Sequence, residues 1–299
     1  MNLDPTTLRL FTEIARTGSL TQGAQAAFRS PAAASARIRA LEDALGQQLL
    51  YRDNKGVTLT EAGQTLLRHA HILLRQIDTL RDEITQSGSG HIRIYANTTA
   101  VTEFMPEILS QFLATRPLVT VDLQERLTHD ILRGVEDGSA DLGIVSGPVE
   151  RAGMVARTFS TDRLMLATPI GHPLARRDAV DFAATLDHDH IGLHEGSTLL
   201  AFLRGLMGPA DYARRLRVQV RSFEAMCRMV EAGVGLGIVP ESAARRHART
   251  MEIALVALTD DWATRDRKLL IRDTKALPRA AADLADAIMS AGAGGTLTD

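Results

Sequence analysis

Residues 19–42 read SLTQGAQAAFRSPAAASARIRALE, and this stretch decides the fold of the amino-terminal part of the chain. It predicts two short helices separated by a tight break. Ser19 and Gln22 have the spacing of a capping box, in which each side chain bonds the other residue's backbone N–H. Ser30 followed by Pro31 predicts the start of the second helix, because serine accepts from free N–H groups and proline already has a helical φ.

The second helix is predicted to bury one side and expose the other. Its apolar stripe has helical spacing and consists of Ala34, Ile38, Leu41 and Leu45. Small or basic residues lie off the stripe: Ser35, Ala36, Arg37, Arg39 and Ala40. A helix with a small outer face can enter a groove, but an ordinary packed pair with a solvated basic face has the same spacing. Spacing alone leaves both interpretations open.

The composition is that of an ordinary globular protein, with material for about two domains. Of the 299 residues 45% are hydrophobic, and the formal charge is −2, so any nucleic-acid contact requires a local basic patch. The single cysteine, Cys227, excludes an internal disulfide and a thiolate zinc cluster. The amino terminus lacks a signal-peptide pattern, and no apolar run approaches about eighteen residues. We therefore expect a soluble, cytoplasmic protein.

The segments around residues 19–42 extend the same pattern. Asp4-Pro5 begins another helix with one apolar face, and Gly46 is the expected stop of the third helix. Residues 49–60, LLYRDNKGVTLT, predict two short strands with Lys55 at the tip of their turn. Three helices and such a hairpin predict a winged helix-turn-helix over residues 1–59, with the second motif helix as the reader of the major groove.

Within residues 60–90 one long helix is predicted from Thr60 through about Gln86, followed by a joint. A heptad seam with alternating spacings of four and three runs along the helix: Leu66, Ala70, Leu73, Ile77, Leu80 and Ile84. So narrow a seam on a helix of about 40 Å favours a partner helix, while packing on the chain's own domain is the alternative. The run SGSG at 87–90 predicts a flexible joint.

From residue 91 onward strands and helices alternate in two halves, which predicts an α/β fold. In the first half the expected elements cover 91–96, 102–114, 119–124, 128–137 and 141–145. In the second half and the closing segment they cover 163–169, 190–194, 197–207, 217–222, 224–231, 237–240, 268–272 and 276–289, ahead of a frayed tail from residue 292. We expect a parallel sheet in the first half and a ligand cleft between the two lobes. The expected lobe boundaries within 91–299 are about 91–161 with 268–299, and about 162–267.

The chain resembles the LysR-type transcriptional regulators along its whole length. The amino-terminal residues that carry the resemblance keep the family's order and spacing: Leu10-Phe11, Gly18-Ser19-Leu20-Thr21, Ser30, Ala33, Ser35, Ile38, Leu41-Glu42, Leu45-Gly46, Leu49, Arg52 and Leu59-Thr60-Glu61-Ala62-Gly63. A weaker set continues with Met105-Pro106, Ala140-Asp141-Leu142-Gly143-Ile144, His172-Pro173-Leu174-Ala175, Gly192-Leu193, Gly233-Val234-Gly235-Leu236-Gly237, Pro240, Trp262 and Arg265. The resemblance implies a DNA reader, a dimerising linker helix and an effector domain similar to periplasmic binding proteins, usually assembled as a homotetramer.

The recognition helix departs from the family pattern at three positions. Pro31 and Ala32 stand where the family commonly has Gln and Pro, and Ala36 stands where a basic residue is frequent. A glutamine for adenine and a cation for guanine or phosphate are therefore missing. We expect a reader that relies more on close helix approach, backbone contacts and DNA shape than the family does.

The expected DNA contacts divide into two kinds. Phosphate anchoring is expected from Arg29, Arg52 and Lys55, and base-edge contact from Ser30, Ser35 and Arg37. The full set of expected DNA contacts is Thr21, Arg29, Ser30, Pro31, Ala32, Ser35, Arg37, Arg39, Arg52 and Lys55. Each arginine taken alone is equally explained as a solvated surface charge.

Hydroxyl groups at the starts of predicted helices are the main candidate effector contacts. A helix start offers N–H groups and a positive dipole end to a carboxylate or a similar anion. A helix cap explains such a hydroxyl equally well, and both interpretations stand for Thr128. The family's pocket positions favour ligand contact for Thr99 and Ser197. The expected effector contacts are Thr98, Thr99, Thr128, Ser146, Gly196, Ser197, Thr198 and Phe223.

Three other features do not predict a site. The three histidines within residues 188–194 include an H-x-H but no fixed third ligand, so no metal site is expected. The three glycines within residues 233–237 precede a strand, which favours a tight turn over a dinucleotide-binding loop. Cys227 falls on the buried side of its predicted helix, with no base beside it in the sequence.

Together these expectations describe a ligand-responsive transcription factor. Its expected partners are double-stranded operator DNA, a small anionic effector, further copies of the chain and RNA polymerase, with no cofactor and no membrane. Ligand binding would shift the populations of two arrangements of the DNA-binding pairs. An enzyme is disfavoured because no nucleophile–base–acid set, metal set or phosphate loop emerges. A solute-binding protein of a transporter is disfavoured by the winged helix-turn-helix and by the absence of a signal-peptide pattern.

Overall fold

The structure is a computed structural model that describes residues 4–53, 56–85, 89–149, 153–207, 215–272 and 277–294. Its amino-terminal part consists of α1 (Pro5–Thr17), α2 (Leu20–Ala26), α3 (Pro31–Leu45), β1 (Leu50–Asp53) and β2 (Gly56–Leu59). The predicted caps are present, because Ser19 Oγ accepts from the N–H of Gln22 at 3.4 Å and Ser30 Oγ from that of Ala33 at 3.3 Å. Gly46 ends α3 with a left-handed φ of 62°, a conformation that glycine adopts without strain.

A small core holds the three helices and the hairpin together. Its fully buried members include Phe11 from α1 and Ile38 from α3, and Leu50 contributes from β1. The strands β1 and β2 pair antiparallel, and the Glu42 carboxylate on α3 accepts from the N–H of Leu49 at 2.8 Å. The predicted winged helix-turn-helix is confirmed, whereas the expected hairpin tip at Lys55 lies outside the described residues.

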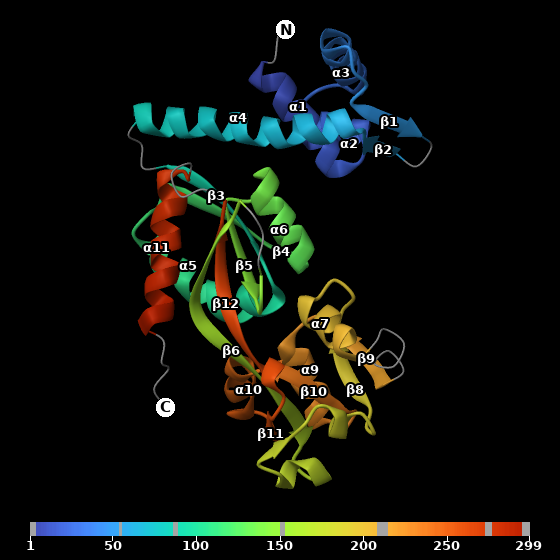
Figure 1. The fold of residues 1–299 in the computed structure, drawn as a ribbon, viewed down its shortest axis with the longest axis vertical. Coiled ribbons are helices and arrows are strands. Elements are labelled where there is room, and N and C mark those ends of the chain that lie inside the picture. Colours follow the sequence, from blue (N-terminus) through green and yellow to red (C-terminus); the bar gives the residue numbers. More distant parts are fainter. Residues whose placement is uncertain are drawn as a thin grey trace.

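The long helix α4 (Glu61–Thr85) follows the hairpin at once. Thr60 Oγ1 accepts from the N–H of Gly63 at 3.0 Å, so Thr60 caps the helix instead of being its first residue. Figure 1 shows α4 lying across the top of the α/β part of the chain, beside α1. The predicted end of the helix at Gln86 lies outside the described residues.

The predicted seam of α4 divides into two parts. Leu66 and Ala70 pack within the chain. Ala70 is fully buried in a cluster with Leu8 of α1, so the expectation that Ala70 faces a partner helix is wrong. Leu73, Leu80 and Ile84 are exposed in a single chain. The difference arises because α1 lies against the first half of α4 and covers its seam there.

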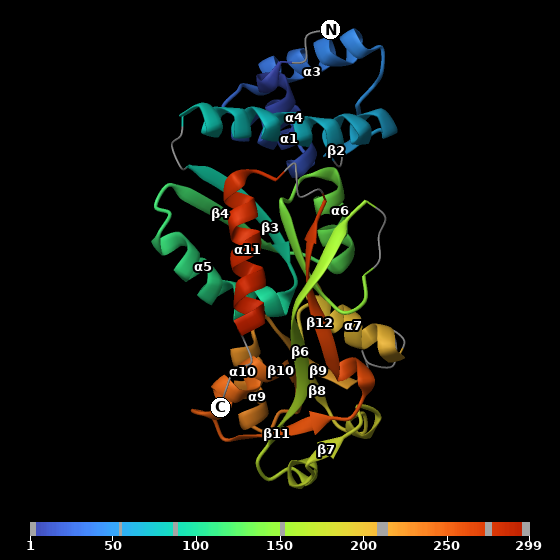
Figure 2. The ribbon, with the colours of Figure 1, turned by 60° about the vertical axis from the view of Figure 1, so that its left-hand side comes forward.

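Lobe I begins after the joint. Its elements are β3 (Gly90–Ala96), the π-helix η1 (Ala100–Phe104), α5 (Met105–Ala114), β4 (Val119–Glu125), α6 (Thr128–Asp137), β5 (Leu142–Ser146), the first part of β6 (Val155–Pro169), β12 (Thr264–Ile271) and α11 (Arg279–Gly294). α5 and α11 cover one face of the sheet and α6 covers the other. Figure 2 shows α11 across the front of β3.

Two helix boundaries and one expected helix cap in lobe I differ from the expectation. The helix expected from residue 102 begins at Ala100 with a π-helical segment, and α11 continues through Gly294 where a frayed tail was expected. Thr128 does not cap α6, because the cap position is Leu127 and no side chain makes the cap bond. The parallel pairing of β3 with β4 and β5 is confirmed, but β12 joins β5 antiparallel and makes the sheet mixed.

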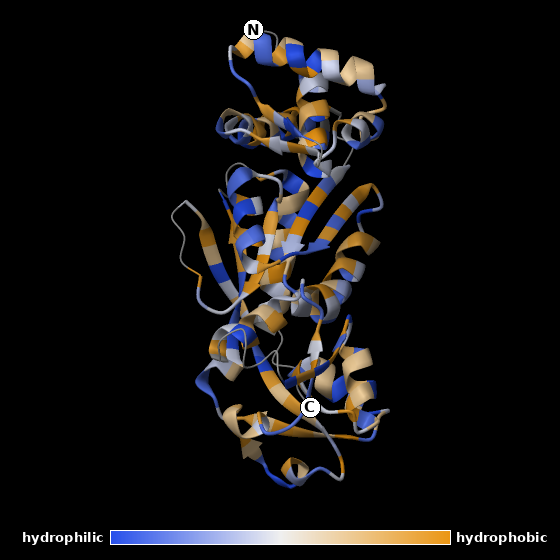
Figure 3. Cartoon of the chain, turned by 90° about the vertical axis from the view of Figure 1, so that its right-hand side faces the viewer, coloured by the Kyte–Doolittle hydropathy of each residue, from blue (hydrophilic) through white to orange (hydrophobic). Residues whose placement is uncertain are grey.

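Lobe II contains the rest of the chain. Its elements are the second part of β6, η2 (Pro173–Arg176), β7 (Ala179–Val180), η3 (Ala183–Thr185), β8 (His190–Leu193), α7 (Thr198–Met207), β9 (Leu216–Val220), α9 (Phe223–Glu231), β10 (Leu236–Pro240), α10 (Glu241–Ala248), β11 (Ile253–Leu258) and η4 (Asp261–Ala263). Cys227 is buried in α9, as expected, and burial raises the pKa of its thiol to about 11. Figure 3 shows hydrophobic bands recurring along the strands inside both lobes.

Two long strands connect the lobes. β6 pairs with β12 through Arg163 and then with β10 and β11 from Leu164 onward, so the two lobes share it. The pairing with β12 shifts register between Arg267 and Lys268, a bulge at the crossing. Sequence patterns predicted only 163–169 and 268–272 as strand here, because the exposed residues 155–158 carry no apolar run. Among the described helices, none has the length and apolar content needed to cross a membrane.

Candidate functional site

The outer face of α3 is the first candidate site. Several side chains of α3 are exposed and small: Pro31, Ala32, Ala33 and Ala36 in the amino-terminal half, and Ala40 beyond it. The buried side consists of Ala34, Ile38 and Leu41, so the predicted division of the helix into two faces is present. At these positions nothing larger than a proline ring or a methyl group covers the helix backbone, whereas the Arg39 side chain reaches back to Ser35 beside them.

Two arginines meet at Ser35 beside this face. Arg39 Nη2 donates to Ser35 Oγ at 3.1 Å, and Arg52 Nη1 from β1 donates to the same oxygen at 3.4 Å. Arg52 also forms an ion pair with Glu42 at 3.4 Å, which holds its guanidinium at the junction of α3 and the hairpin. Arg29 and Thr21 are exposed, whereas the expected contact at Lys55 lies outside the described residues.

Arg37 is engaged within the domain. Its Nε donates to Thr7 Oγ1 at 2.5 Å, and its Nη2 forms an ion pair with Asp4 Oδ2 at 2.8 Å. Hydrogen bonds from Thr7 and Arg37 hold the pKa of the Asp4 carboxyl well below its usual range. The expectation that Arg37 faces base edges took no account of this contact, since Asp4 and Arg37 are far apart in the sequence.

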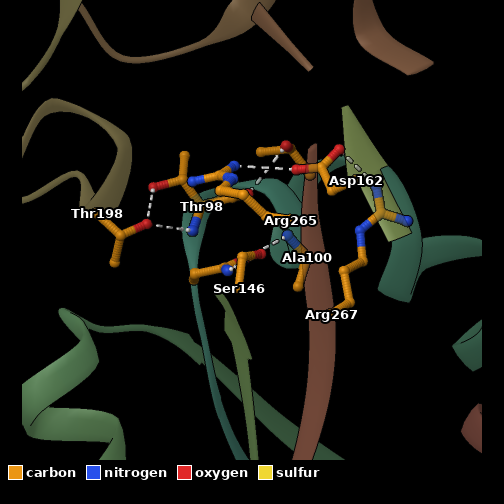
Figure 4. A network of polar contacts seen from close by, with 9 residues as sticks. Thr98, Ala100, Ser146, Asp162, Thr198, Arg265 and Arg267 are labelled. Carbon is orange, nitrogen blue, oxygen red and sulfur yellow. Dashed lines mark hydrogen bonds and ion pairs between the residues drawn. The ribbon is translucent and has the colours of Figure 1, made fainter. Parts of the chain in front are cut away.

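The second candidate site lies where the two lobes meet, and we call it the interlobe site. It contains Thr98, Ser146, Asp162, Thr198, Arg265 and Arg267, which Figure 4 labels, together with Asn97 and Ser197, which hydrogen-bond to members of this set. Thr98 Oγ1, at the end of β3, lies 3.2 Å from Ser197 Oγ and 3.4 Å from Thr198 Oγ1 across the lobe boundary. The structure thus brings together expected contacts that are about a hundred residues apart in the sequence.

On the lobe I side of the interlobe site, hydrogen bonds of Asn97 connect three elements. Asn97 Nδ2 donates to Ser146 Oγ at 2.8 Å, and Asn97 Oδ1 accepts from the N–H of Ala100 at 2.9 Å. Thr99 is buried beside them and makes no side-chain cap bond, although it precedes η1. Asn97, which was not among the expected contacts, fixes the relative positions of β3, β5 and η1.

A buried charge cluster forms the strand side of the interlobe site. Asp162 on β6 accepts from Arg265 Nη2 at 3.1 Å and from Arg267 Nη2 at 2.9 Å, with both arginines on β12. The Asp162 side chain is 1% exposed and the two arginine side chains are 10% and 12% exposed. The Nε atoms of both arginines are buried and have no hydrogen-bond partner among the residues that the structure describes. Two buried cations therefore share one carboxylate.

The two arginines stack on aromatic rings of different lobes. The Arg265 guanidinium carbon lies 5.1 Å from the ring centre of Phe202 on α7, and that of Arg267 lies 5.4 Å from Phe104 in η1. Burial lowers the pKa of Arg265, and Asp162 acts against that shift. The cluster thus spans the boundary between the lobes, with Asp162 between the two stacked arginines.

Comparison with known proteins places this geometry in a family. Residues 85–293 match the family model described as LysR substrate binding domain, and residues 5–64 match that of the bacterial regulatory helix-turn-helix protein, lysR family. The transcriptional activator IlvY of Salmonella typhimurium is 32% identical over 249 residues, which cover 80% of this chain and 83% of IlvY. The chain belongs to the LysR family.

Solved structures of LysR-type regulators have the same fold along almost the entire chain. A full-length OxyR variant from Pseudomonas aeruginosa is similar with a TM-score of 0.70 at 22% identity, covering 96% of this chain and 95% of OxyR. Full-length CbnR in complex with its target DNA gives 0.61 at 21%, covering 96% and 99%. This LysR-type protein is a DNA-binding transcriptional regulator with a substrate-binding domain, and its relatives are regulators and not enzymes.

Three further expected effector contacts of this LysR-type regulator are outside the set of residues that forms the interlobe site. Phe223 is 2% exposed inside the lobe II core, so the expectation that it contacts a ligand is corrected by its packing. Gly196 is exposed beside the His194 ring. Thr128 is half-buried at the start of α6, where it makes no cap bond.

The glycine turn and the histidine cluster were not expected to bind a ligand, and their positions in the structure are as follows. Gly233 adopts a left-handed φ of 73° in the turn between α9 and β10, as expected for a helix-to-strand turn. His190 is buried with its Nε2 at 3.0 Å from the carbonyl oxygen of Thr185. Among the described residues, no group of three or more His, Cys, Asp or Glu side chains could hold a metal ion.

The linker helix of this LysR-type regulator is fastened to lobe I by a buried ion pair. Arg75 Nη1 on α4 donates to Asp141 Oδ1 at 2.7 Å, while Asp141 Oδ2 accepts from the N–H of Arg93 on β3 at 2.8 Å. The Asp141 side chain is 5% exposed. Asp141 directly precedes β5, whose last residue is Ser146, so one strand connects the linker helix to the interlobe site. Sequence reasoning singled out none of these groups as contacts.

Proposed function

We propose that this LysR-type regulator reads operator DNA with the exposed face of α3. The observation that carries the proposal is the run of small exposed side chains at Pro31, Ala32 and Ala36, which lets the helix backbone approach base edges closely. Sequence preference then comes from Ser30 and Ser35, from backbone contacts and from the shape of the groove.

The basic residues around α3 have divided roles in this proposal. Arg29, Arg39 and Arg52, together with Lys55, bind phosphates and position the helix. Arg37 acts as a positioning residue, because its guanidinium joins α3 to the start of α1. We therefore no longer assign a base to Arg37.

We propose that the effector is a small anion bound at the interlobe site. Among the described residues, Arg265 and Arg267 have only the buried carboxylate of Asp162 as an ion-pair partner, so this cluster of three side chains carries a net positive charge in a place where water is largely excluded. An anionic group at Arg265 would restore neutrality, and the hydroxyls of Thr98, Ser197 and Thr198 are available to orient it.

Oligomerisation completes the proposed mechanism. The exposed half of the α4 seam, Leu73, Leu80 and Ile84, is assigned to a second copy of the chain, in a dimer or tetramer that also contacts RNA polymerase. Two reading helices on a dimer predict half-sites separated by about one or more helical turns of DNA. The effector would shift the arrangement of these pairs by its differential affinity for two states.

Selection from a library of genomic fragments tests the DNA reader. The wild-type protein is expected to enrich a partly palindromic site with affinity that falls steeply as salt rises. Ala36→Glu places a negative charge on the proposed contact face and should weaken binding to that site by roughly a hundredfold or more, since it adds repulsion from phosphates and a larger side chain.

Ser110→Glu is the matched control, because Ser110 is exposed on α5 in lobe I and the substitution adds the same charge far from α3. It should bind the selected site like the wild type. Failure of the wild type to enrich any fragment, or equal loss of binding in both variants, would contradict the assignment of α3.

A further inference from the structure

Glu125 brings a negative charge to the interlobe site from the lobe I side. It is the last residue of β4, and its Oε1 accepts from Thr98 Oγ1 at 2.7 Å. The same hydroxyl oxygen lies 3.2 Å from Ser197 Oγ and 3.4 Å from Thr198 Oγ1 of lobe II. We call the hydroxyls of Thr98, Ser197 and Thr198 the ring of hydroxyls. The Glu125 carboxylate is half-buried and, through its bond with Thr98, borders this ring where the two lobes meet.

The carboxylate of Glu125 is not neutralised by its basic neighbour. Arg126 instead donates to Gln124 Oε1 at 2.6 Å and to the backbone carbonyl of Glu125 at 3.1 Å, and stacks over the ring of Tyr95. Within the described part of the chain, no Lys, Arg or His nitrogen lies within 4.0 Å of the Glu125 carboxylate oxygens. Thr98 supplies one hydrogen bond, which leaves further acceptor sites on the carboxylate.

The opposite charge borders the same ring of hydroxyls. Arg265 stacks on Phe202, which lies one helical turn after Thr198 on α7 and so on the same face of that helix. The unbalanced arginine charge is therefore near Thr198, and the unpaired carboxylate is near Thr98. Those two side chains are 3.4 Å apart, so only a short molecule is needed to reach from one charge to the other.

We infer that the effector is a short carboxylate that also carries a hydrogen-bond donor, a hydroxyl or an ammonium group, within a few bonds of its carboxyl carbon. The inference rests on the proposed anionic effector and goes one step further. The carboxylate of the ligand pairs with Arg265, and its donor binds Glu125. Its carbon chain lies against the aromatic side chain of Phe202.

The physical reason is the cost of desolvating Glu125. When the lobes close on a ligand, the Glu125 carboxylate loses contact with water. A ligand without a hydrogen-bond donor then leaves the remaining acceptor sites of Glu125 unsatisfied. A hydrogen bond to a charged group accounts for a roughly ten- to hundredfold difference in binding. Every carboxylate is also repelled by Glu125; an ammonium group on the ligand offsets this repulsion by its charge, and a hydroxyl offsets it by a hydrogen bond.

Binding to matched sets of small acids tests the inference. The probes are straight-chain carboxylates of three to six carbons, each in unsubstituted form and with a hydroxyl or an amino group at carbon 2 or 3, in both enantiomers. Isothermal titration of the full-length protein is expected to give at least one substituted acid that binds about tenfold or more tightly than the unsubstituted acid of the same length.

Two variants separate the kinds of donor. Glu125→Gln keeps an acceptor oxygen and the bond from Thr98 but removes the charge, so it should abolish a preference for an amino group and retain much of a preference for a hydroxyl. Glu125→Ala should abolish both preferences. Glu107→Gln, at an exposed position on α5, removes the same charge elsewhere and should leave every preference unchanged.

The possible outcomes distinguish the donor inference from the proposal of an anionic effector. Unsubstituted acids that bind as tightly as the substituted ones would overturn the donor inference and leave the anionic effector standing. A donor preference that persists in Glu125→Ala would also overturn it, because the donor would then bind elsewhere. Binding of none of the acids would overturn the inference together with the anionic effector. Thermal melts of all variants confirm that each is folded.

Discussion

At the scale of single residues, histidines with lowered pKa values tie the stability of this regulator to pH. Burial lowers the pKa values of His71, His172 and His247, and it lowers that of His190 to about 4. His190 lies inside lobe II, with Nε2 at 3.0 Å from the Thr185 carbonyl oxygen. A histidine that is neutral when folded and charged when unfolded weakens the fold in acid.

His190 gives a prediction with a defined pH window. Between about pH 6.5 and 4 the unfolded chain binds a proton at this position that the folded chain does not, so the free energy of unfolding falls as the pH falls through that range. The contribution is on the order of 3 kcal/mol by pH 4. Chemical denaturation at several pH values should give a flatter pH dependence for His190→Gln than for the wild type. Parallel curves for the two proteins would contradict the assignment.

Arg37 shows which residue roles the sequence could predict. Ser19, Ser30 and Asp4 were predicted as helix caps and are caps, because a cap depends on residues only two or three positions away. The engagement of Arg37 with Asp4 and Thr7 joins two helices separated by about thirty residues, which no local pattern encodes. The same holds for Asp162 with Arg265 and Arg267, where the period-two spacing of the arginines was the only local signal.

At the scale of elements, the two halves of α4 differ in what covers their apolar faces. Ala70 is buried against α1, while Leu73, Leu80 and Ile84 are exposed, so only the second half of the helix offers a continuous apolar face. Sequence periodicity identified the whole seam, because heptad spacing records that a face is apolar and not which partner covers it.

Leu73→Asp tests the exposed part of the seam. A charged side chain at a helix–helix contact is desolvated without a partner, so the variant should be a monomer by light scattering at concentrations where the wild type is a dimer or larger. Thr65→Asp adds the same charge to an exposed position off the seam and should keep the wild-type mass. An unchanged mass for Leu73→Asp would remove the seam from the proposed assembly.

Strand lengths were predicted less well than helix starts. β6 and β12 extend well beyond their apolar cores, to residues 155 and 264, because each is held by pairing with distant strands. Their charged residues lie on the ribbon that joins the lobes, where a sequence pattern indicates an exposed loop. The part of the site that was missed is therefore the part built on long-range strand pairing.

At the scale of the whole molecule, the Arg75–Asp141 ion pair connects the DNA-reading part to lobe I. Asp141→Asn keeps an acceptor for the N–H of Arg93 but leaves the Arg75 charge largely buried without a counter-charge. It should lower the free energy of unfolding by about 3 kcal/mol, and Arg75→Met should cost a similar amount.

Denaturant unfolding of the two single variants and the double variant checks this. The double variant should lose clearly less than the sum of the single losses, with an interaction energy of about 1 kcal/mol or more, because the two side chains contact each other. Simple additivity would mean that the contact between α4 and lobe I contributes little to the arrangement of the domains.

Linkage between the two sites tests the account most directly. The affinity of the wild-type protein for its selected DNA site is measured by fluorescence anisotropy with and without a saturating concentration of the tightest carboxylate from the titrations. We expect this carboxylate to change the DNA affinity by about fivefold or more, and DNA to change the affinity for the carboxylate by the same factor in the same direction. Tight binding of both partners with no effect of either on the other would contradict it.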